Sequence, residues 1–124
     1  MEGDVFLRRL VNAVNRGGTA EFAVTLTVGG VVVSGVLLSG SEYHARVTEH
    51  LVEVAGSDEV ATALRAAIDP RDLSPEEEAI GYIHLRDAHI VQPSGALLPA
   101  GPGVLWRGRL ETVDSFVLGL GQGR

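Results

Sequence analysis

Apolar and polar side chains alternate most regularly between Gly81 and Val91, and this period of two predicts a β-strand. Two strand-like runs precede it, Phe22 to Val28 and Val31 to Leu38. Two more follow it, Val104 to Val113 and Phe116 to Leu120. The stretch Gly81–Val91 is therefore predicted to be the middle strand of five.

The first two strands are predicted to form a hairpin, because Gly29-Gly30 separates them and glycine accepts the positive backbone angles of a tight turn. The run Val31 to Leu38 has apolar residues at both parities, which is typical of a strand buried on both faces. Gly35 in its middle predicts a bend or bulge.

Three- and four-residue spacings predict helices in two places. Residues 5–15 form an amphipathic pattern, interpreted first as a helix that covers one open end of the sheet and alternatively as a docking helix for a partner. A second helix is predicted to start at the N-cap Ser41 and to end at Gly56, and a third to start near Ser57. These helices lie in an insertion, about residues 41–78, between the second and third strands.

The helical insertion holds the negative charge of the chain. The chain has 124 residues and a net charge of −6, and residues 41–78 alone contain ten acidic residues and three arginines. This asymmetry indicates either a solvated acidic face or a surface for a basic partner. The acidic total also argues against a nucleic-acid backbone as the partner.

Proline and glycine are concentrated in residues 92–103, which predicts a turn-rich loop. A loop of this length is either a contact surface or a variable hairpin connection. The strand that follows places Trp106, Gly108 and Leu110 on one face and the arginines on the other. Residues 120–124 are predicted to be a flexible tail.

Together these elements predict a single α+β domain over residues 1–124. The sheet is expected to be small, antiparallel, five-stranded and strongly bent, or closed as an SH3/Sm-like barrel. An N-terminal helix and the helical insertion between strands 2 and 3 complete the prediction.

Several classes of function are disfavoured by the residue types present. The chain has no cysteine, which removes thiol chemistry and cysteine-ligated metals. The histidines lack metal-ligand spacing; His84 and His89, five apart on one strand, are expected on opposite faces. No catalytic residue, cofactor or metal site is predicted, and no membrane span or secretory leader is apparent, so we expect a non-enzymatic cytoplasmic protein.

A contact surface is the remaining hypothesis. In the central strand, His84, Arg86 and His89 are interpreted as a solvated or partner-facing edge. The residues predicted to contact a partner are Trp106, Arg107, Arg109, Arg86, Glu49 and Glu53.

The order of elements resembles the Sm-like small β-barrel. The likeness includes the strand Ile83-His84-Leu85-Arg86-Asp87-Ala88 and the pair Arg107-Gly108. The aspartate-to-asparagine RNA-binding loop of that family is replaced here by the acidic helical insertion. An oligomeric barrel that binds single-stranded RNA or another partner is therefore kept as the alternative.

A resemblance over nearly the whole chain is carried by short motifs that lie mainly in the strands. They are Leu10-Val11-Asn12, Val24 to Gly30, Val33 to Tyr43, Tyr82 to Ala88, Trp106 to Leu110 and Val113 to Gly119. These segments resemble the GvpU-type gas-vesicle accessory proteins. The resemblance implies a role in vesicle assembly or clustering inside the cell, without enzymatic chemistry. It implies gas-vesicle proteins or copies of the chain itself as partners, and the open edges of a small sheet predict a homo-oligomer.

Overall fold

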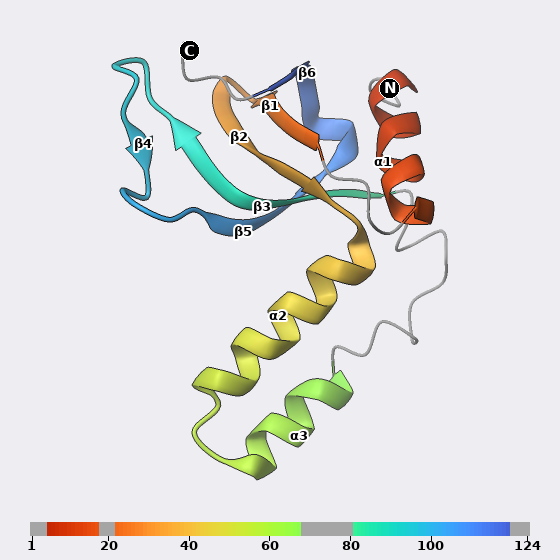
Figure 1. Ribbon diagram of the computed structural model, residues 1–124, viewed down its shortest axis with the longest axis vertical. Helices are drawn as coiled ribbons and strands as arrows, with labels where there is room; N and C mark the ends of the chain where they lie inside the picture. Colours follow the sequence, from red (N-terminus) through yellow and green to blue (C-terminus); the bar gives the residue numbers. More distant parts are fainter. Residues whose placement is uncertain (1–4, 18–21, 68–80, 120–124) are drawn as a thin grey trace.

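The computed structural model describes residues 5–17, 22–67 and 81–119 and shows an α+β fold. One helix packs against an antiparallel sheet, and a pair of helices projects away from that sheet (Figure 1). The elements are α1 (Val5–Gly17), β1 (Phe22–Val28), β2 (Val31–Leu38), α2 (Gly40–Val54), α3 (Asp58–Ala67), β3 (Tyr82–Val91), β4 (Leu97–Leu98), β5 (Val104–Arg109), a short 3-10 helix (Leu110–Thr112) and β6 (Val113–Leu118).

The sheet has six strands and is open, so the predictions of five strands and of a strongly bent or closed barrel are wrong. Its order is β4-β3-β2-β1-β6, and β5 also pairs with β3. Within the described residues, no pairing joins β6 to β4 or β5, and a barrel needs such a closing pair. The sixth strand is β4, a two-residue strand inside the Pro/Gly-rich segment. It pairs with Ile90 and Val91 of β3.

The core lies between α1 and one face of the sheet. Leu7, Val11 and Val14 of α1 are at most 1% exposed. They belong to one buried cluster with Val24, Leu26, Val33, Leu37, Ile83, Leu85, Ala88, Leu110 and Val113. The buried side of α1 therefore covers a face of the sheet, where the covering-helix interpretation had expected an open end, and Val5 and Phe6 in its first turn stay exposed.

A β-bulge interrupts β3 at Asp87. Leu85 pairs with Trp106 and Ala88 pairs with Val104, so β3 advances three residues while β5 advances two. Asp87 takes a positive φ of 53° there. Side-chain alternation shifts by one residue at this point, so the spacing argument that placed His84 and His89 on opposite faces does not hold.

Two glycines make room for the bulge. A Cβ on Gly35 of β2 would lie 3.0 Å from the carbonyl oxygen of Arg86. A Cβ on Gly103, just before β5, would lie 2.3 Å from the carbonyl carbon of Asp87. The bulge predicted from Gly35 is thus present, and its extra residue belongs to the facing strand β3.

Helix α2 begins two residues earlier than the sequence suggested. Ser39, and not Ser41, is the N-cap, because its Oγ accepts a hydrogen bond from the backbone N–H of Glu42 at 3.1 Å. Ser57 precedes α3 as predicted, and its Oγ accepts from the N–H of Val60 at 3.2 Å. The predicted end of the insertion beyond residue 67 and the predicted tail lie outside the described residues.

The last strand also differs from the prediction. The 3-10 helix Leu110–Thr112 ends β5, and β6 starts at Val113. Asp114 therefore lies within β6 and not in a turn. Its carboxylate accepts a hydrogen bond from the N–H of Gly29 at 2.9 Å, which ties β6 to the β1–β2 turn.

Candidate functional site

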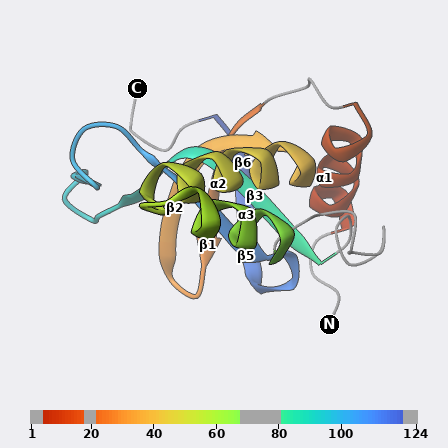
Figure 2. The same cartoon turned by 90° about the horizontal axis from the view of Figure 1, so that it is seen from below.

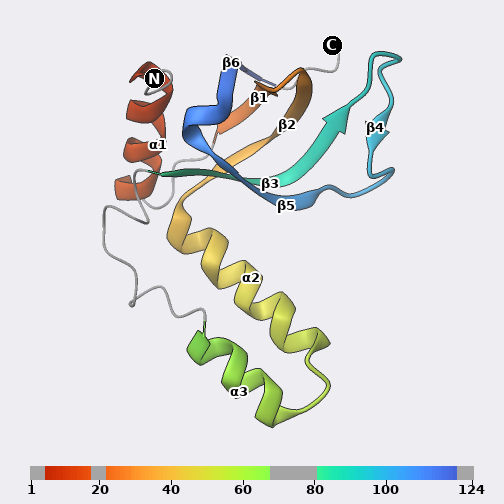
Figure 3. The same ribbon diagram turned by 180° about the vertical axis from the view of Figure 1, so that it is seen from behind.

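A groove of about 860 Å³ lies beside α2, between this helix and the strands β3 and β5. The helix leaves the sheet at an angle, which is visible from both sides (Figures 1 and 3). The groove is lined by Glu42, Tyr43, Arg46, Val47, Glu49, His50, Leu51 and Glu53 of α2, Arg86 and Asp87 of β3, Gly103 just before β5, and Val104 and Leu105 of β5.

Helical spacing sorts the α2 side chains into an apolar row and a charged row. Tyr43, Val47 and Leu51 are four residues apart and half-buried. Glu42, Arg46, Glu49 and Glu53 form the neighbouring charged row, separated by three or four residues. On the opposite wall, Val104 and Leu105 add apolar surface. The groove therefore has an apolar floor and a charged rim.

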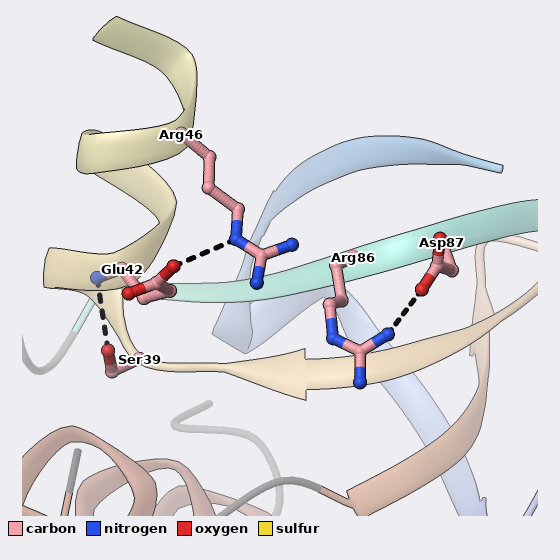
Figure 4. A network of polar contacts seen from close by, with 5 residues as sticks. All are labelled: Ser39, Glu42, Arg46, Arg86 and Asp87. Carbon is pink, nitrogen blue, oxygen red and sulfur yellow. Dashed lines mark hydrogen bonds and ion pairs between the residues drawn. The ribbon is translucent and has the colours of Figure 1, made fainter. Parts of the chain in front are cut away.

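Both arginines of the rim are paired with carboxylates inside the protein. Arg46 Nε donates to Glu42 Oε2 at 2.9 Å, one helical turn away. Arg86 pairs with the adjacent Asp87 at the bulge (Figure 4). Glu49 and Glu53 are exposed, and His50 Nδ1 lies 4.0 Å from Glu53 Oε1. The rim is thus left with an excess of negative charge on α2.

A cluster of aromatic and basic side chains holds the first turns of α2 against the sheet. The ring centroid of His84 on β3 lies 4.5 Å from that of Tyr43 and 6.3 Å from that of His44. Arg107 of β5 donates from Nε to His84 Nε2 at 3.1 Å. The Arg107 guanidinium also lies 3.7 Å from the ring centroid of Tyr82. We call these five residues the His84 cluster.

His84 is neutral in this cluster. Its Nε2 accepts a hydrogen bond from a guanidinium, which has no acceptor of its own, so the ring proton must be on Nδ1. Burial lowers the pKa of His84 from 6.5 to about 3, and Arg107 and His44 act in the same direction. The prediction that His84 lies on a solvated edge is wrong, since the residue is only 2% exposed.

The six predicted contact residues do not form one surface. Arg86, Glu49 and Glu53 come together in the groove. Arg107 belongs to the His84 cluster, and Arg109 pairs with Glu111. Trp106 lies on the other face of β5, where it packs partly against the core and where a Cβ on Gly108 would lie 2.4 Å from its ring.

A second, smaller hollow of about 330 Å³ is almost entirely apolar. It lies at the end of the sheet where β3, β4 and β5 meet, and Trp106 forms part of its wall. The other lining residues are Val33, Ala88, His89, Ile90, Leu98, Pro99 and Val104. This hollow was not predicted, because the sixth strand, β4, which forms one side of it, is absent from the sequence-based prediction.

Among residues 5–17, 22–67 and 81–119, no three His, Asp or Glu side chains are grouped as metal ligands would be. Within the same ranges, no helix has both the length and the apolar character that a membrane crossing requires.

Comparison with known proteins places this chain in a family. The family model described as "Gas vesicle protein GvpU-like" matches residues 4–120, which is nearly the whole chain. The chain belongs to the GvpU-like family of gas vesicle proteins. No curated protein matched it, and no solved structure did. The sequence motifs that suggested this family lie mainly in the strands and in the start of α2, so they describe the scaffold more than the groove.

Proposed function

We propose that the protein is a non-enzymatic accessory protein of gas vesicles, acting in vesicle assembly or clustering through protein–protein contacts inside the cell. The match to the GvpU-like family over residues 4–120 carries the proposal. The groove beside α2 supports it, because an open groove with an apolar floor and a charged rim is suited to a protein segment. Gas-vesicle proteins are the proposed partners.

The RNA-binding alternative loses the two observations that motivated it. The sheet is open where an Sm-like barrel would be closed. Arg109 is paired with Glu111, and Arg107 donates to His84 and lies over the Tyr82 ring, so the two arginines do not form a free cationic pair on the strand for a phosphate. No described feature favours RNA over a protein partner.

Flotation tests the proposal directly. Purified protein is mixed with gas vesicles at physiological salt and centrifuged at low speed, so that buoyant vesicles rise with whatever they bind. We expect the protein in the buoyant layer with intact vesicles, and in the lower phase when the vesicles have been collapsed and removed. Protein that stays in the lower phase with intact vesicles would contradict the proposal.

A further inference from the structure

We propose that the groove beside α2 binds a cationic amphipathic segment of a partner protein. The apolar side chains of that segment pack against Val47, Leu51 and Leu105, and its basic side chains pair with Glu49 and Glu53. The proposal rests on the proposed function for the setting of the partner. It goes further by naming the chemistry of that partner and the residues that recognise it.

The charge of the rim is the first argument. Glu42 and Asp87 already have arginine partners, and these pairs contribute no net charge to the rim. Within the described part of the chain, no arginine pairs with Glu49 or Glu53. A partner that brings two cations would neutralise this pair of carboxylates beside a partly apolar surface, where ion pairs are screened less than in open water.

The spacing of these carboxylates indicates the form of the segment. Glu49 and Glu53 are four residues apart on α2, and therefore lie about 6 Å apart along the helix axis. Cations four residues apart on a facing helix have the same spacing. The apolar row Tyr43, Val47 and Leu51 runs parallel to them, so an amphipathic helix laid along α2 can satisfy both rows at once.

Charge also decides between possible occupants. A second copy of this chain has a net charge of −6 and the same acidic helix. Its α1 is basic, but the apolar face of that helix is buried in its own core. Residues 68–80 of the chain contain five acidic residues and one arginine, so they match the rim poorly. A cationic segment from a different protein is the complementary occupant.

A designed peptide probes this chemistry without vesicles. The probe is a fluorescent Leu/Lys peptide of about 18 residues, or five helical turns, with leucines on one face and lysines on the other. A Leu/Glu peptide of the same pattern is the control probe. We expect fluorescence anisotropy to detect saturable binding of the Leu/Lys peptide to the wild-type protein and none of the Leu/Glu peptide.

Two variants with the same change in net charge locate the binding. Glu49→Gln with Glu53→Gln removes the rim carboxylates, whereas Ala63→Arg with Ala66→Arg adds two cations on the exposed face of α3. We expect about a fivefold loss of affinity for the first variant and less than about a twofold loss for the second, since local pairing outweighs distant charge at physiological salt. Circular dichroism should show the same helix content in both.

Three results would overturn the proposal. They are no binding by the wild type, equal losses for the two variants, or equal binding of the Leu/Glu peptide. Because no vesicle takes part, a negative flotation result with positive peptide binding would reject the proposed function and leave the groove chemistry standing. The reverse result would reject the groove and keep the function.

Discussion

His84 is a neutral histidine enclosed by Tyr43, His44 and Arg107 at the junction of α2 with the sheet. Its ring both packs against Tyr43 and accepts the hydrogen bond of Arg107. A buried base of this kind makes folding sensitive to acid, because protonation would place a second cation beside the guanidinium.

The pH dependence follows from the two pKa values. In the unfolded chain His84 titrates near 6.5, and in the folded protein near 3. Between these values only the unfolded state binds the proton, so the free energy of unfolding falls as the pH falls, by up to about 1.4 kcal/mol per pH unit from this residue. Above pH 6.5 His84 has no such effect.

Urea unfolding at about pH 7, 6 and 5 measures the free energy of unfolding at each pH. Variants of His84 and of another histidine separate the contribution of His84 from that of other titrating groups. His84→Gln keeps an acceptor for Arg107 but cannot titrate, so we expect its free energy of unfolding to fall less steeply below about pH 6.5 than that of the wild type. His50→Gln, at an exposed position of α2, should follow the wild type. If the free energy of unfolding fell equally steeply with pH for the wild type and His84→Gln, the assignment of His84 as a buried neutral histidine would be wrong.

The sequence revealed part of the site at the residue scale. Arg86, Glu49 and Glu53 were recognisable as exposed charged residues on a strand and a helix, and they do line the groove. The role of His84 was hidden, because strand alternation marks a polar face without showing what packs on it. Here Tyr43 of α2 packs on it, a contact across 41 positions of sequence that no local pattern encodes.

At the scale of elements, α2 depends on its first turn. The N-cap Ser39 is 4% exposed, and the His84 cluster fixes the next turn against β3. Further along, α2 packs against α3 among the described residues, and seen from below the two helices lie in front of the sheet (Figure 2). The direction of the groove is therefore set where α2 begins.

Ser39→Ala tests this dependence. Loss of the bond to the Glu42 N–H leaves a helix N-terminus without its cap, so we expect the free energy of unfolding to fall by about 1 kcal/mol in chemical denaturation. Ser41→Ala is the matched control, because Ser41 is exposed and is not the cap. Its effect should stay within about 0.5 kcal/mol. A larger loss of free energy of unfolding from Ser41→Ala than from Ser39→Ala would indicate that Ser41 is the N-cap, as the sequence had suggested.

The elements themselves were mostly predictable, and their ends were not. The hydrophobic periodicity predicted α1, β1, β2 and β3, because each of these elements has regularly spaced apolar residues on one buried face or on both faces. The break between β5 and β6 was predicted too late in the chain, at residues 114–115, because Leu110 is apolar and buried and so continues the strand pattern through the 3-10 helix. The two residues of β4 are too few to show a period.

For the whole molecule, the open sheet leaves β6 as an edge. Within the described residues β6 pairs with β1 alone, and its Val117 and Leu118 are 58% and 62% exposed. The chain has no lysine, the residue that most often prevents an edge strand from pairing with another chain. We therefore expect a dimer or larger assembly. A symmetric dimer would present two grooves, and so offers the bivalence that clustering of vesicles requires.

Light scattering over a concentration series measures this association. We expect a mass above that of one 13.1 kDa chain, falling towards it on dilution. Val117→Arg places a charge on the edge and should shift the equilibrium towards the monomer. Val54→Arg, at a 64% exposed position of α2, should not. A monomer mass for the wild type at every concentration would contradict the expectation.

Flotation with the variants tests the central claim, that this GvpU-like protein binds gas vesicles through the groove beside α2. The wild type and the variant Ala63→Arg with Ala66→Arg are predicted to rise with intact vesicles at physiological salt. The variant Glu49→Gln with Glu53→Gln is predicted to remain mostly in the lower phase. Equal flotation of both variants would contradict the role of the groove, and a wild type that does not float would contradict the association with vesicles itself.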